Sequence, residues 1–244
     1  MGPGQAFVVV PARRSATRLP GKLSLADSGK PLLAHTLERC LASRRAARVI
    51  AAVDGPELAA VARAAGAEAV LTDPDLPSGS DRVWAAVQSL PEARWIVNVQ
   101  GDEPEIDPAA IDALFEALAG GAEVATLAAP WPEGSDPADP AAVKVVRAGD
   151  GRALYFSRAP IPFRRQAGAA GPSLHLGVYA YTREALAAFA SSPPTPLERT
   201  EGLEQLRFLE RGTPIQVLPW PFAFPGVDTR ADYDAFLQRQ KLGT

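Results

Sequence analysis

Short apolar runs alternate with segments of helical periodicity through the first half of the chain, and this alternation restricts the fold more than any other feature. Between the runs, apolar residues recur three and four positions apart, as they do from Ile111 to Leu118. Strands that alternate with helices predict an α/β fold with a mainly parallel sheet. The expected strands are Phe7–Val10, Val49–Val53, Val70–Thr72, Trp95–Val99 and Val124–Ala128, and the expected helices are Pro31–Ser43, one from Pro56 capped by Asp54, Val83–Leu90 and Ile111–Leu118.

The second half of the chain is less regular. Val143–Val146 and Leu154–Phe156 flank an Asp150–Gly151 turn, a pattern typical of a β-hairpin. We also expect strands at Leu174–Tyr181 and Ile215–Leu218. The sequence shows neither an internal repeat nor a long linker, so it favours one domain with an inserted or appended dimerisation element.

Two further helices are expected near the end of the sequence. One covers Leu197–Arg211 and is weakened by Gly202, which costs about 1 kcal/mol relative to alanine inside a helix. The last helix opens with Thr229 and Asp232, which have the spacing of a capping box with Asp in place of the usual Glu.

Composition excludes several classes of protein. The sequence contains 25 Lys and Arg residues and 28 Asp and Glu residues. The resulting net charge of −3 gives no general basic field that would attract nucleic acid. The single cysteine, Cys40, allows neither an intrachain disulfide nor a multi-cysteine zinc site. No apolar run approaches the ~20 residues that cross a bilayer, so we expect no membrane insertion. The first apolar stretch is too short for a signal peptide, and we expect a cytoplasmic protein.

A cationic loop follows the first expected strand directly. Its sequence, PARRSATRLPGK, places four cations and several small hydrogen-bond donors at a strand end, where an α/β sheet binds ligands. This composition suits a polyphosphate, although the spacing is not that of a P-loop. The alternative is a solvated basic turn. The residues concerned are Arg13, Arg14, Ser15, Thr17, Arg18, Gly21 and Lys22.

A carboxylate follows another expected strand, in the sequence QGDEP at 100–104. Gly101 allows the backbone to approach a ligand closely, and Asp102 then stands at the strand end. Mg²⁺ favours one or two carboxylates together with phosphate oxygens, so Asp102 is a candidate metal ligand. The alternative is an ordinary polar turn. Asp228 in GVDT is a candidate second ligand, but it could equally belong to the start of the last helix.

One face of the Leu174–Tyr181 strand is polar and aromatic. Such a face could line a sugar pocket, because aromatic rings contact the carbon skeleton and their polar tips reach hydroxyls. It could equally be the outer face of a half-exposed strand. The face consists of His175, Gly177, Tyr179 and Tyr181. We expect His35 to be solvated and Cys40 to lie in the core.

Taken together, these segments resemble the 3-deoxy-manno-octulosonate cytidylyltransferase family, the CMP-Kdo synthetases of lipopolysaccharide biosynthesis. Eight segments match in order over most of the chain: VVVPARRSATRLPGK, SGSDR, VNVQGDEP, VKVV, ALYFSRAPIPF, HLGVYAY, LEQLR and GVDT. The resemblance implies a three-layer α/β/α nucleotide-diphospho-sugar transferase fold with a mainly parallel mixed sheet. It also implies the reaction of CTP with 3-deoxy-D-manno-octulosonate (Kdo) to give CMP-Kdo and pyrophosphate, with Mg²⁺ and in a homodimer.

The resemblance also implies roles for individual residues. Arg13 and Lys22 match positions that bind the triphosphate, Ser15 lies in the same loop, and Asp102 and Asp228 match the Mg²⁺-binding acids. The positions around cytosine and ribose are Ser78, Gly79, Arg82 and Gln100. Those around the sugar acid are Arg158, His175, Tyr179, Glu204 and Gln205. The family's usual QSGTER reads PSGSDR here, with Pro77 in place of Gln.

We therefore expect a single cytidylyltransferase domain over 1–244, with a nucleotide-binding half at 1–130 and a sugar-binding and dimerisation half at 131–244. Two alternatives remain open. One is a cytidylyltransferase for another sugar acid, such as a sialic acid or an amino-substituted Kdo. The other is a non-catalytic nucleotide-binding paralogue, against which the intact acids and Lys22 argue.

Overall fold

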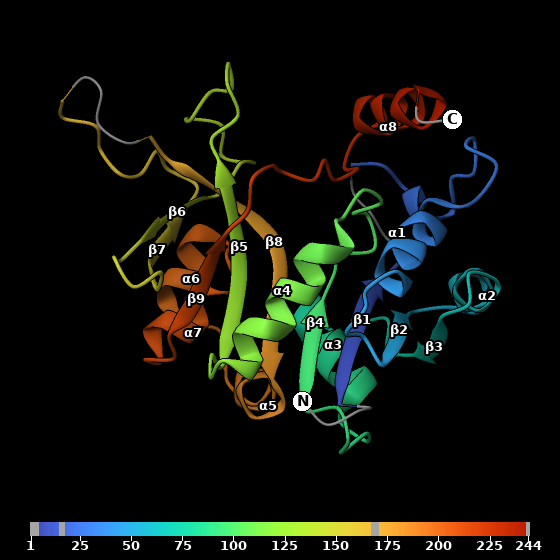
Figure 1. Cartoon of the computed structure of the whole chain (residues 1–244). Helices are drawn as coiled ribbons and strands as arrows, with labels where there is room; N and C mark the ends of the chain where they lie inside the picture. The colour runs from blue at the N-terminus through green and yellow to red at the C-terminus, as the bar shows by residue number, and fades with distance from the viewer. Residues whose placement is uncertain (1–4, 15–17, 167–170, 243–244) are drawn as a thin grey trace. The chain divides into compact units, whose positions relative to one another are not determined.

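The computed structural model describes residues 5–14, 18–166 and 171–242. The chain divides into two compact units, one formed by 1–115 together with 224–244 and the other by 116–223. The C-terminal segment thus returns to the first unit, which a division of the sequence at residue 130 does not anticipate. Figure 1 shows the elements of each unit along the chain.

A parallel sheet forms the centre of the first unit. Its strands lie in the order β3, β2, β1, β4, with Val9 opposite Ile50 of β2 and Asn98 of β4. All seven residues of β1 are buried, as its unbroken apolar sequence predicts for a central parallel strand. The strands are β1 (Ala6–Ala12), β2 (Arg48–Val53), β3 (Glu68–Leu71) and β4 (Trp95–Asn98).

Helices connect these strands. The chain runs from β1 to β3 in one direction and then crosses back to β4, so right-handed connections place α1 and α2 on one face of the sheet and α3 on the other. This order gives the unit three layers. The helices are the 3₁₀ turn η1 (Lys22–Ser24), α1 (Leu32–Leu41), α2 (Pro56–Ala64), α3 (Gly79–Val87), α4 (Pro108–Ala119) and α8 (Arg230–Leu242).

The predicted cap of α2 is wrong. Gly55 occupies the N-cap position, and the Asp54 carboxylate instead accepts hydrogen bonds from the backbone N–H of Arg14, at 3.0 and 3.1 Å. Asp54 therefore holds the start of the cationic loop. By contrast, the predicted capping box of α8 is confirmed, since the Asp232 carboxylate accepts from the Thr229 N–H at 2.8 Å and Asp232 N–H donates to Thr229 Oγ1 at 3.2 Å.

His35 is buried, contrary to the expected solvated position. Only 8% of its surface is exposed, its Nε2 lies 2.8 Å from Ser28 Oγ, and its ring meets Phe236 of α8 edge to face. The polar face of α1 is covered because α8 returns from the far end of the sequence. Leu32, Val227, Tyr233 and Phe236 form a fully buried cluster at this contact.

The second unit contains a mixed sheet. Its central strand β5 pairs with β8 in antiparallel and with β9 in parallel orientation. The predicted hairpin is confirmed, because β6 pairs antiparallel with β7 across the Asp150–Gly151 turn. The strands are β5 (Val124–Pro130), β6 (Lys144–Arg147), β7 (Ala153–Ser157), β8 (Ser173–Thr182) and β9 (Ile215–Pro219). The predicted α/β fold with a mixed, mostly parallel sheet is thereby confirmed.

The helix predicted over Leu197–Arg211 is two helices. Gly202 adopts a left-handed conformation, with φ of 62°, and ends the first of them. A continuous helix was wrong because the glycine is a C-terminal cap rather than a weak interior position. The helices of this unit are α5 (Arg183–Ala190), α6 (Pro196–Glu201) and α7 (Leu206–Glu210).

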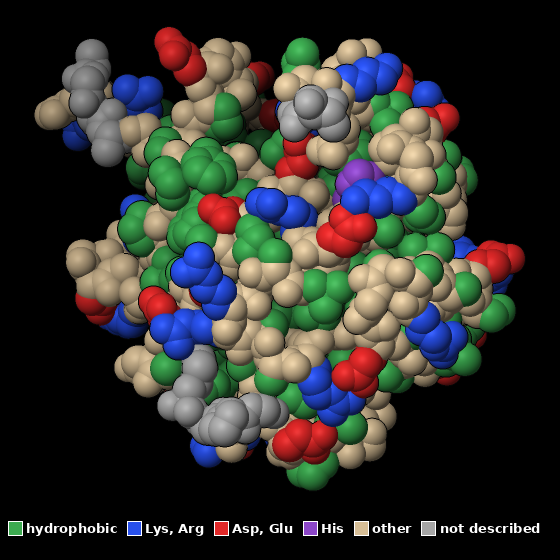
Figure 2. Space-filling model, turned by 45° about the vertical axis from the view of Figure 1, so that its right-hand side comes forward, with side chains coloured by type: hydrophobic (Ala, Val, Ile, Leu, Met, Phe, Trp, Pro, Cys, Tyr) green, Lys and Arg blue, Asp and Glu red, His purple; other side chains and the backbone are tan. Residues whose placement is uncertain are grey.

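The described surface carries both signs of charge. Figure 2 shows Lys and Arg side chains interspersed with Asp and Glu over the face in view, in keeping with the small net charge of −3. Within the described residues, no helix has both the length and the apolar character that crossing a membrane requires.

Candidate functional site

Close backbone packing places Asp102 at the carboxyl end of the first unit's sheet. A Cβ atom on Gly101 would lie 3.1 Å from the Pro11 carbonyl oxygen, which is tighter than ordinary contact, so the chain can pass there only as glycine without a shift. Thr36 Oγ1 donates to the Gly101 carbonyl at 2.9 Å and fixes the turn. The next residue, Asp102, therefore stands beside the strand that carries the cationic loop.

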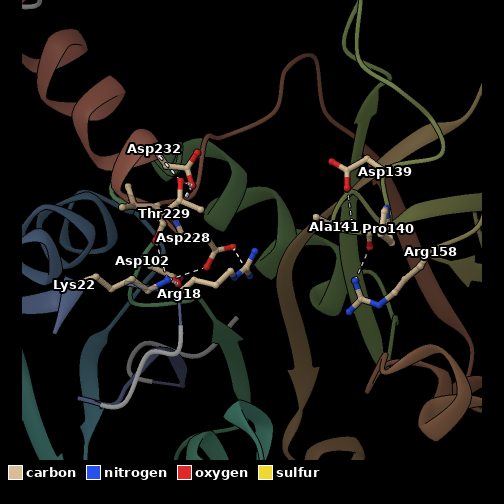
Figure 3. Close-up of polar contacts among 11 residues, drawn as sticks. Arg18, Lys22, Asp102, Asp139, Pro140, Ala141, Arg158, Asp228, Thr229 and Asp232 are labelled. Carbon is tan, nitrogen blue, oxygen red and sulfur yellow. Dashed lines mark hydrogen bonds and ion pairs between the residues drawn. The ribbon is translucent and has the colours of Figure 1, made fainter. Parts of the chain in front are cut away.

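Lys22 joins two carboxylates that are 126 positions apart in the sequence. Its Nζ lies 2.5 Å from Asp102 Oδ2 and 2.9 Å from Asp228 Oδ1, and it donates to the Val227 carbonyl at 2.8 Å. The other oxygen of Asp228 accepts from Arg18 Nη2 at 2.9 Å. We call Arg18, Lys22, Asp102 and Asp228 the Lys22 cluster, drawn on one side of Figure 3. Both acids therefore converge on one cationic group.

The backbone around Asp228 is held at several points. Val227 N–H donates to the Asp102 carbonyl at 2.9 Å, and the Asp232 carboxylate accepts from the Asp228 N–H at 3.1 Å. The interpretation of Asp228 as part of the helix start is correct for its backbone, whose N–H is held by Asp232 of α8. Its carboxylate faces Lys22, and its role as a metal ligand stays a prediction.

The two carboxylates favour the charged form of Lys22. Burial alone lowers the pKa of Lys22, but the charges and hydrogen bonds of Asp102 and Asp228 outweigh burial and raise it. Lys22 is only 8% exposed, so its ammonium is a fixed, desolvated cation. Sequence reasoning assigned Lys22 to the triphosphate and did not anticipate that it would contact both acids.

Glu103 is a neighbour that the sequence interpretation missed. Burial, followed by the charges of Asp102 and Asp228, raises the pKa of its carboxyl to about 8. Its Oε2 is buried and has no hydrogen-bond partner in the described chain. Gly226 packs against this side chain, where an added Cβ would lie 3.1 Å from Oε1. The sequence signal was its position directly after Asp102 in QGDEP.

The cluster fits Mg²⁺ only in part. Among the described residues, no group of three or more His, Cys, Asp or Glu side chains could hold a metal ion. Asp102 and Asp228 nevertheless approach one point, because a single ammonium contacts both. Two hard-oxygen ligands suit Mg²⁺ when substrate phosphates and water complete the coordination.

The residues predicted to surround the nucleotide have different surroundings. Arg13 is exposed, and Ser15 lies outside the described residues. Ser78 caps α3, accepting from the Asp81 N–H and donating to the Asp81 carboxylate at 2.7 Å. Arg82 is 2% exposed and donates to Thr72 Oγ1 and to the Pro74 carbonyl, so it supports the loop before α3. Gly79 and Gln100 lie side by side, because a Cβ on Gly79 would lie 3.7 Å from Gln100 Oε1.

An aromatic row in the second unit contains two of the predicted sugar-pocket residues. The His175 ring lies 5.0 Å from the Phe156 ring and 5.3 Å from that of Tyr179, which stacks on Tyr181. His175 Nε2 is 3.1 Å from Thr126 Oγ1. Tyr179 is 8% exposed, and its buried hydroxyl has no hydrogen-bond partner in the described chain. A buried polar group of this kind calls for a ligand or water.

The remaining sugar-pocket candidates come from the end of β7 and from the turn between α6 and α7. The Arg158 guanidinium donates to the carbonyls of Pro140, Glu201 and Gly202. Glu204 and Gln205 follow the left-handed Gly202, and Gln205 is 7% exposed. The second unit therefore holds all five predicted sugar-binding residues, and their role stays a prediction.

Comparison with known proteins identifies the family. A family model described as Cytidylyltransferase matches residues 7–215. The 3-deoxy-manno-octulosonate cytidylyltransferase of Anaeromyxobacter dehalogenans is 48% identical, over 93% of this chain and 94% of its own. The protein of that name from Rhodospirillum centenum is 49% identical, over 95% of this chain and 92% of its own. The chain belongs to the CMP-Kdo synthetase family.

Solved structures agree with this membership in the CMP-Kdo synthetase family. A CMP:2-keto-3-deoxy-manno-octonic acid synthetase, solved in complex with CTP, matches with a TM-score of 0.93 and 36% identity, over 98% of this chain and 100% of that one. A cytidylyltransferase from Leptospira borgpetersenii, at 18% identity and a TM-score of 0.62, shares the fold alone. The resemblance drawn from the sequence motifs is confirmed.

The partly buried His175 predicts how stability depends on pH in this CMP-Kdo synthetase family member. Burial lowers the pKa of His175 from 6.5 to about 3. Between these values the unfolded chain binds a proton that the folded chain does not, so the free energy of unfolding falls as pH decreases from about 6.5. We expect His175→Gln to reduce the loss between pH 7 and pH 5 by about 1–2 kcal/mol. Urea unfolding at both pH values measures this difference, and an unchanged loss in the variant would contradict it.

Proposed function

We propose that this protein catalyses the reaction of CTP with Kdo to give CMP-Kdo and pyrophosphate. The observation that carries the proposal is the convergence of Asp102 and Asp228 on one cationic group at the end of the sheet. Relatives that are 48–49% identical over nearly the whole chain are 3-deoxy-manno-octulosonate cytidylyltransferases, which supports the choice of substrates. So does the CTP bound to the structural relative. Since CTP is consumed, we place the reaction in the cytoplasm.

The reaction forms one bond and breaks another at the α-phosphorus. The anomeric oxygen of Kdo attacks this atom, the bond to the bridging oxygen of the β-phosphate breaks, and pyrophosphate leaves while the attacking hydroxyl gives its proton to solvent. Lys22 and Arg13 would stabilise the charge on the departing pyrophosphate. Asp102 and Asp228 would hold Mg²⁺, which when bound lowers the pKa of a coordinated hydroxyl and offsets charge on the phosphate.

Residues of the first unit would position the nucleotide. Gly79 lies beside the Gln100 side chain, since an added Cβ would be in ordinary van der Waals contact with its amide oxygen at 3.7 Å. The Gln100 amide can recognise a base edge or a ribose hydroxyl. Ser78 and Arg82 would shape the loop around that position through their contacts with Asp81, Thr72 and Pro74. Ser15, in the cationic loop, would add a donor to the phosphates.

Residues of the second unit would bind the sugar acid. The Tyr179 hydroxyl, which has no hydrogen-bond partner among the described residues, and the aromatic face of His175 suit a polyhydroxylated carbon chain. Arg158 would pair with the carboxylate, using the two of its five guanidinium N–H groups that the three backbone carbonyls leave over. Glu204 and Gln205 would accept from, or donate to, sugar hydroxyls.

Because different residues are proposed to bind CTP and Kdo, substitutions among them should have distinct kinetic effects. Arg158→Ala and His175→Ala should raise the KM for Kdo about tenfold or more, since they remove contacts to the sugar acid. The KM for CTP should change less than about twofold. Initial-rate kinetics with each substrate varied in turn measures both constants. An equal rise in both for Arg158→Ala would assign this residue to the triphosphate instead.

A homodimer is the expected assembly. Leu154 and Phe163 of the second unit are 60% and 88% exposed, and such apolar side chains can be buried against a second copy. We expect a solution mass of about twice that of one chain, measured by light scattering coupled to size exclusion at micromolar protein. The mass of a single chain across the dilution series would remove this prediction.

A panel of substrates tests the proposed function. Pyrophosphate release is measured with CTP and either Kdo, an amino-substituted Kdo or N-acetylneuraminate, and with UTP in place of CTP. We expect release with CTP and Kdo at the highest kcat/KM of the panel. Preference for another sugar acid would support the rival cytidylyltransferase, and no release with any pair would support a non-catalytic nucleotide-binding protein.

A further inference from the structure

One carboxylate, that of Glu201, organises the end of β7. Its Oε1 accepts from Ser157 Oγ at 2.6 Å and from the Tyr155 hydroxyl at 3.5 Å, and its Oε2 accepts from the Arg158 N–H at 2.9 Å. Burial alone raises the pKa of Glu201, but the hydrogen bonds from Ser157 and Arg158 outweigh burial and lower it. Glu201 thus stays ionised and accepts hydrogen bonds from three residues at the end of β7.

The Arg158 side chain in turn binds the backbone at the end of α6. Its Nε donates to the Glu201 carbonyl at 2.8 Å, and Nη2 donates to the Gly202 carbonyl at 3.2 Å. Nη1 donates to the Pro140 carbonyl at 2.7 Å, a contact drawn in Figure 3. The fully buried Lys144 also donates to the Arg158 carbonyl, at 2.7 Å. Both the backbone and the guanidinium of Arg158 are therefore fixed.

Glu201 also lies directly before the turn between α6 and α7. Glu201 is the last residue of α6, and the left-handed Gly202 directs the chain into Glu204 and Gln205. A displacement of Glu201 would therefore shift the end of β7 relative to this turn. Three of the five proposed sugar-binding residues depend on the two-way contact between Glu201 and Arg158.

We propose that Glu201 is a positioning residue for the sugar acid, which sets the geometry of Arg158 relative to Glu204 and Gln205 without touching the substrate itself. The inference rests on the proposed function. A guanidinium that is already held in its bound geometry loses little conformational entropy on binding, so its preorganisation contributes to affinity for the carboxylate.

The test compares Glu201→Ala, Glu201→Gln and a matched control. Glu201→Ala should raise the KM for Kdo about tenfold and leave the KM for CTP within about twofold. Glu201→Gln should give an intermediate KM for Kdo, because its amide oxygen can accept one of the lost hydrogen bonds. The control is Glu210→Ala, because the Glu210 carboxylate accepts from the N–H groups of Leu197 and Glu198 at the other end of α6.

The control separates positioning from general loosening of α6. Glu210→Ala should lower the melting temperature without changing the KM for Kdo. An unchanged KM for Kdo in Glu201→Ala, or an equal rise in Glu210→Ala, would overturn the proposal. Failure of the proposed function has a different signature: the wild-type protein then releases no pyrophosphate with Kdo, and the positioning role falls with it.

Discussion

Asp102→Asn is expected to lower turnover by about two orders of magnitude or more while the fold is retained. The change keeps the shape of the side chain and one oxygen but removes the charge that attracts a divalent cation. Loss of a group that stabilises the transition state typically costs 10²–10³ in rate, roughly. Asp228→Asn should act in the same way, because both carboxylates approach the same point. Steady-state pyrophosphate release at saturating Mg²⁺ measures the loss.

A carboxylate elsewhere in the same unit provides the control for this prediction. Asp112 accepts from Ser43 Oγ at 2.6 Å and from the N–H groups of Arg44 and Arg45, at distances of 3.2 and 3.1 Å. Asp112→Asn therefore removes one negative charge and weakens several hydrogen bonds without altering the Lys22 cluster. Its turnover should stay within about threefold of wild type. Near wild-type turnover for Asp102→Asn would remove that residue from the proposed metal site.

Lys22→Met is the second change with a large expected effect. With CTP and Kdo, turnover should fall by about two orders of magnitude, because the cation that would stabilise the pyrophosphate is lost. In the absence of nucleotide, the affinity for Mn²⁺ should rise by about tenfold, because the ammonium no longer competes for Asp102 and Asp228. Titration of the free protein, followed by the paramagnetic resonance of unbound Mn²⁺, measures this affinity.

Arg18→Met is the matched control for the rise in affinity. Arg18 forms an ion pair with Asp228, at 2.9 Å, and its side chain is 59% exposed, so solvent screens its charge. The Mn²⁺ affinity of this variant should change less than that of Lys22→Met. An equal rise in both variants would show a general charge effect and would contradict direct competition by Lys22.

Local sequence patterns predicted the elements whose conformation depends on residues close together in the sequence. Unbroken apolar runs predicted the buried strands, and Asp150–Gly151 predicted the hairpin between β6 and β7. Asp102 could be recognised because it follows a buried strand and a glycine that close packing requires. These signals lie within a few residues of the feature that they predict.

Sequence patterns did not predict the features that depend on contacts between residues far apart in the chain. His35 lies on a polar helix face, and its burial depends on Phe236 of α8. The contact of Lys22 with Asp228 joins segments 206 positions apart. Gly202 could be read as a weak helix position or as a cap, and only its backbone conformation distinguishes them. The hydrogen bonds between Arg158 and Glu201 likewise join two residues that are 43 positions apart, at the ends of β7 and α6.

The most direct test of the proposed function is the phosphorus resonance spectrum of the complete reaction. Wild-type protein is incubated with CTP, Kdo and Mg²⁺, and the products are followed over time. We expect the three phosphate signals of CTP to decline together, while one phosphodiester signal and pyrophosphate grow in equal molar amounts. Orthophosphate with CDP, or a CTP spectrum that stays unchanged, would contradict this expectation.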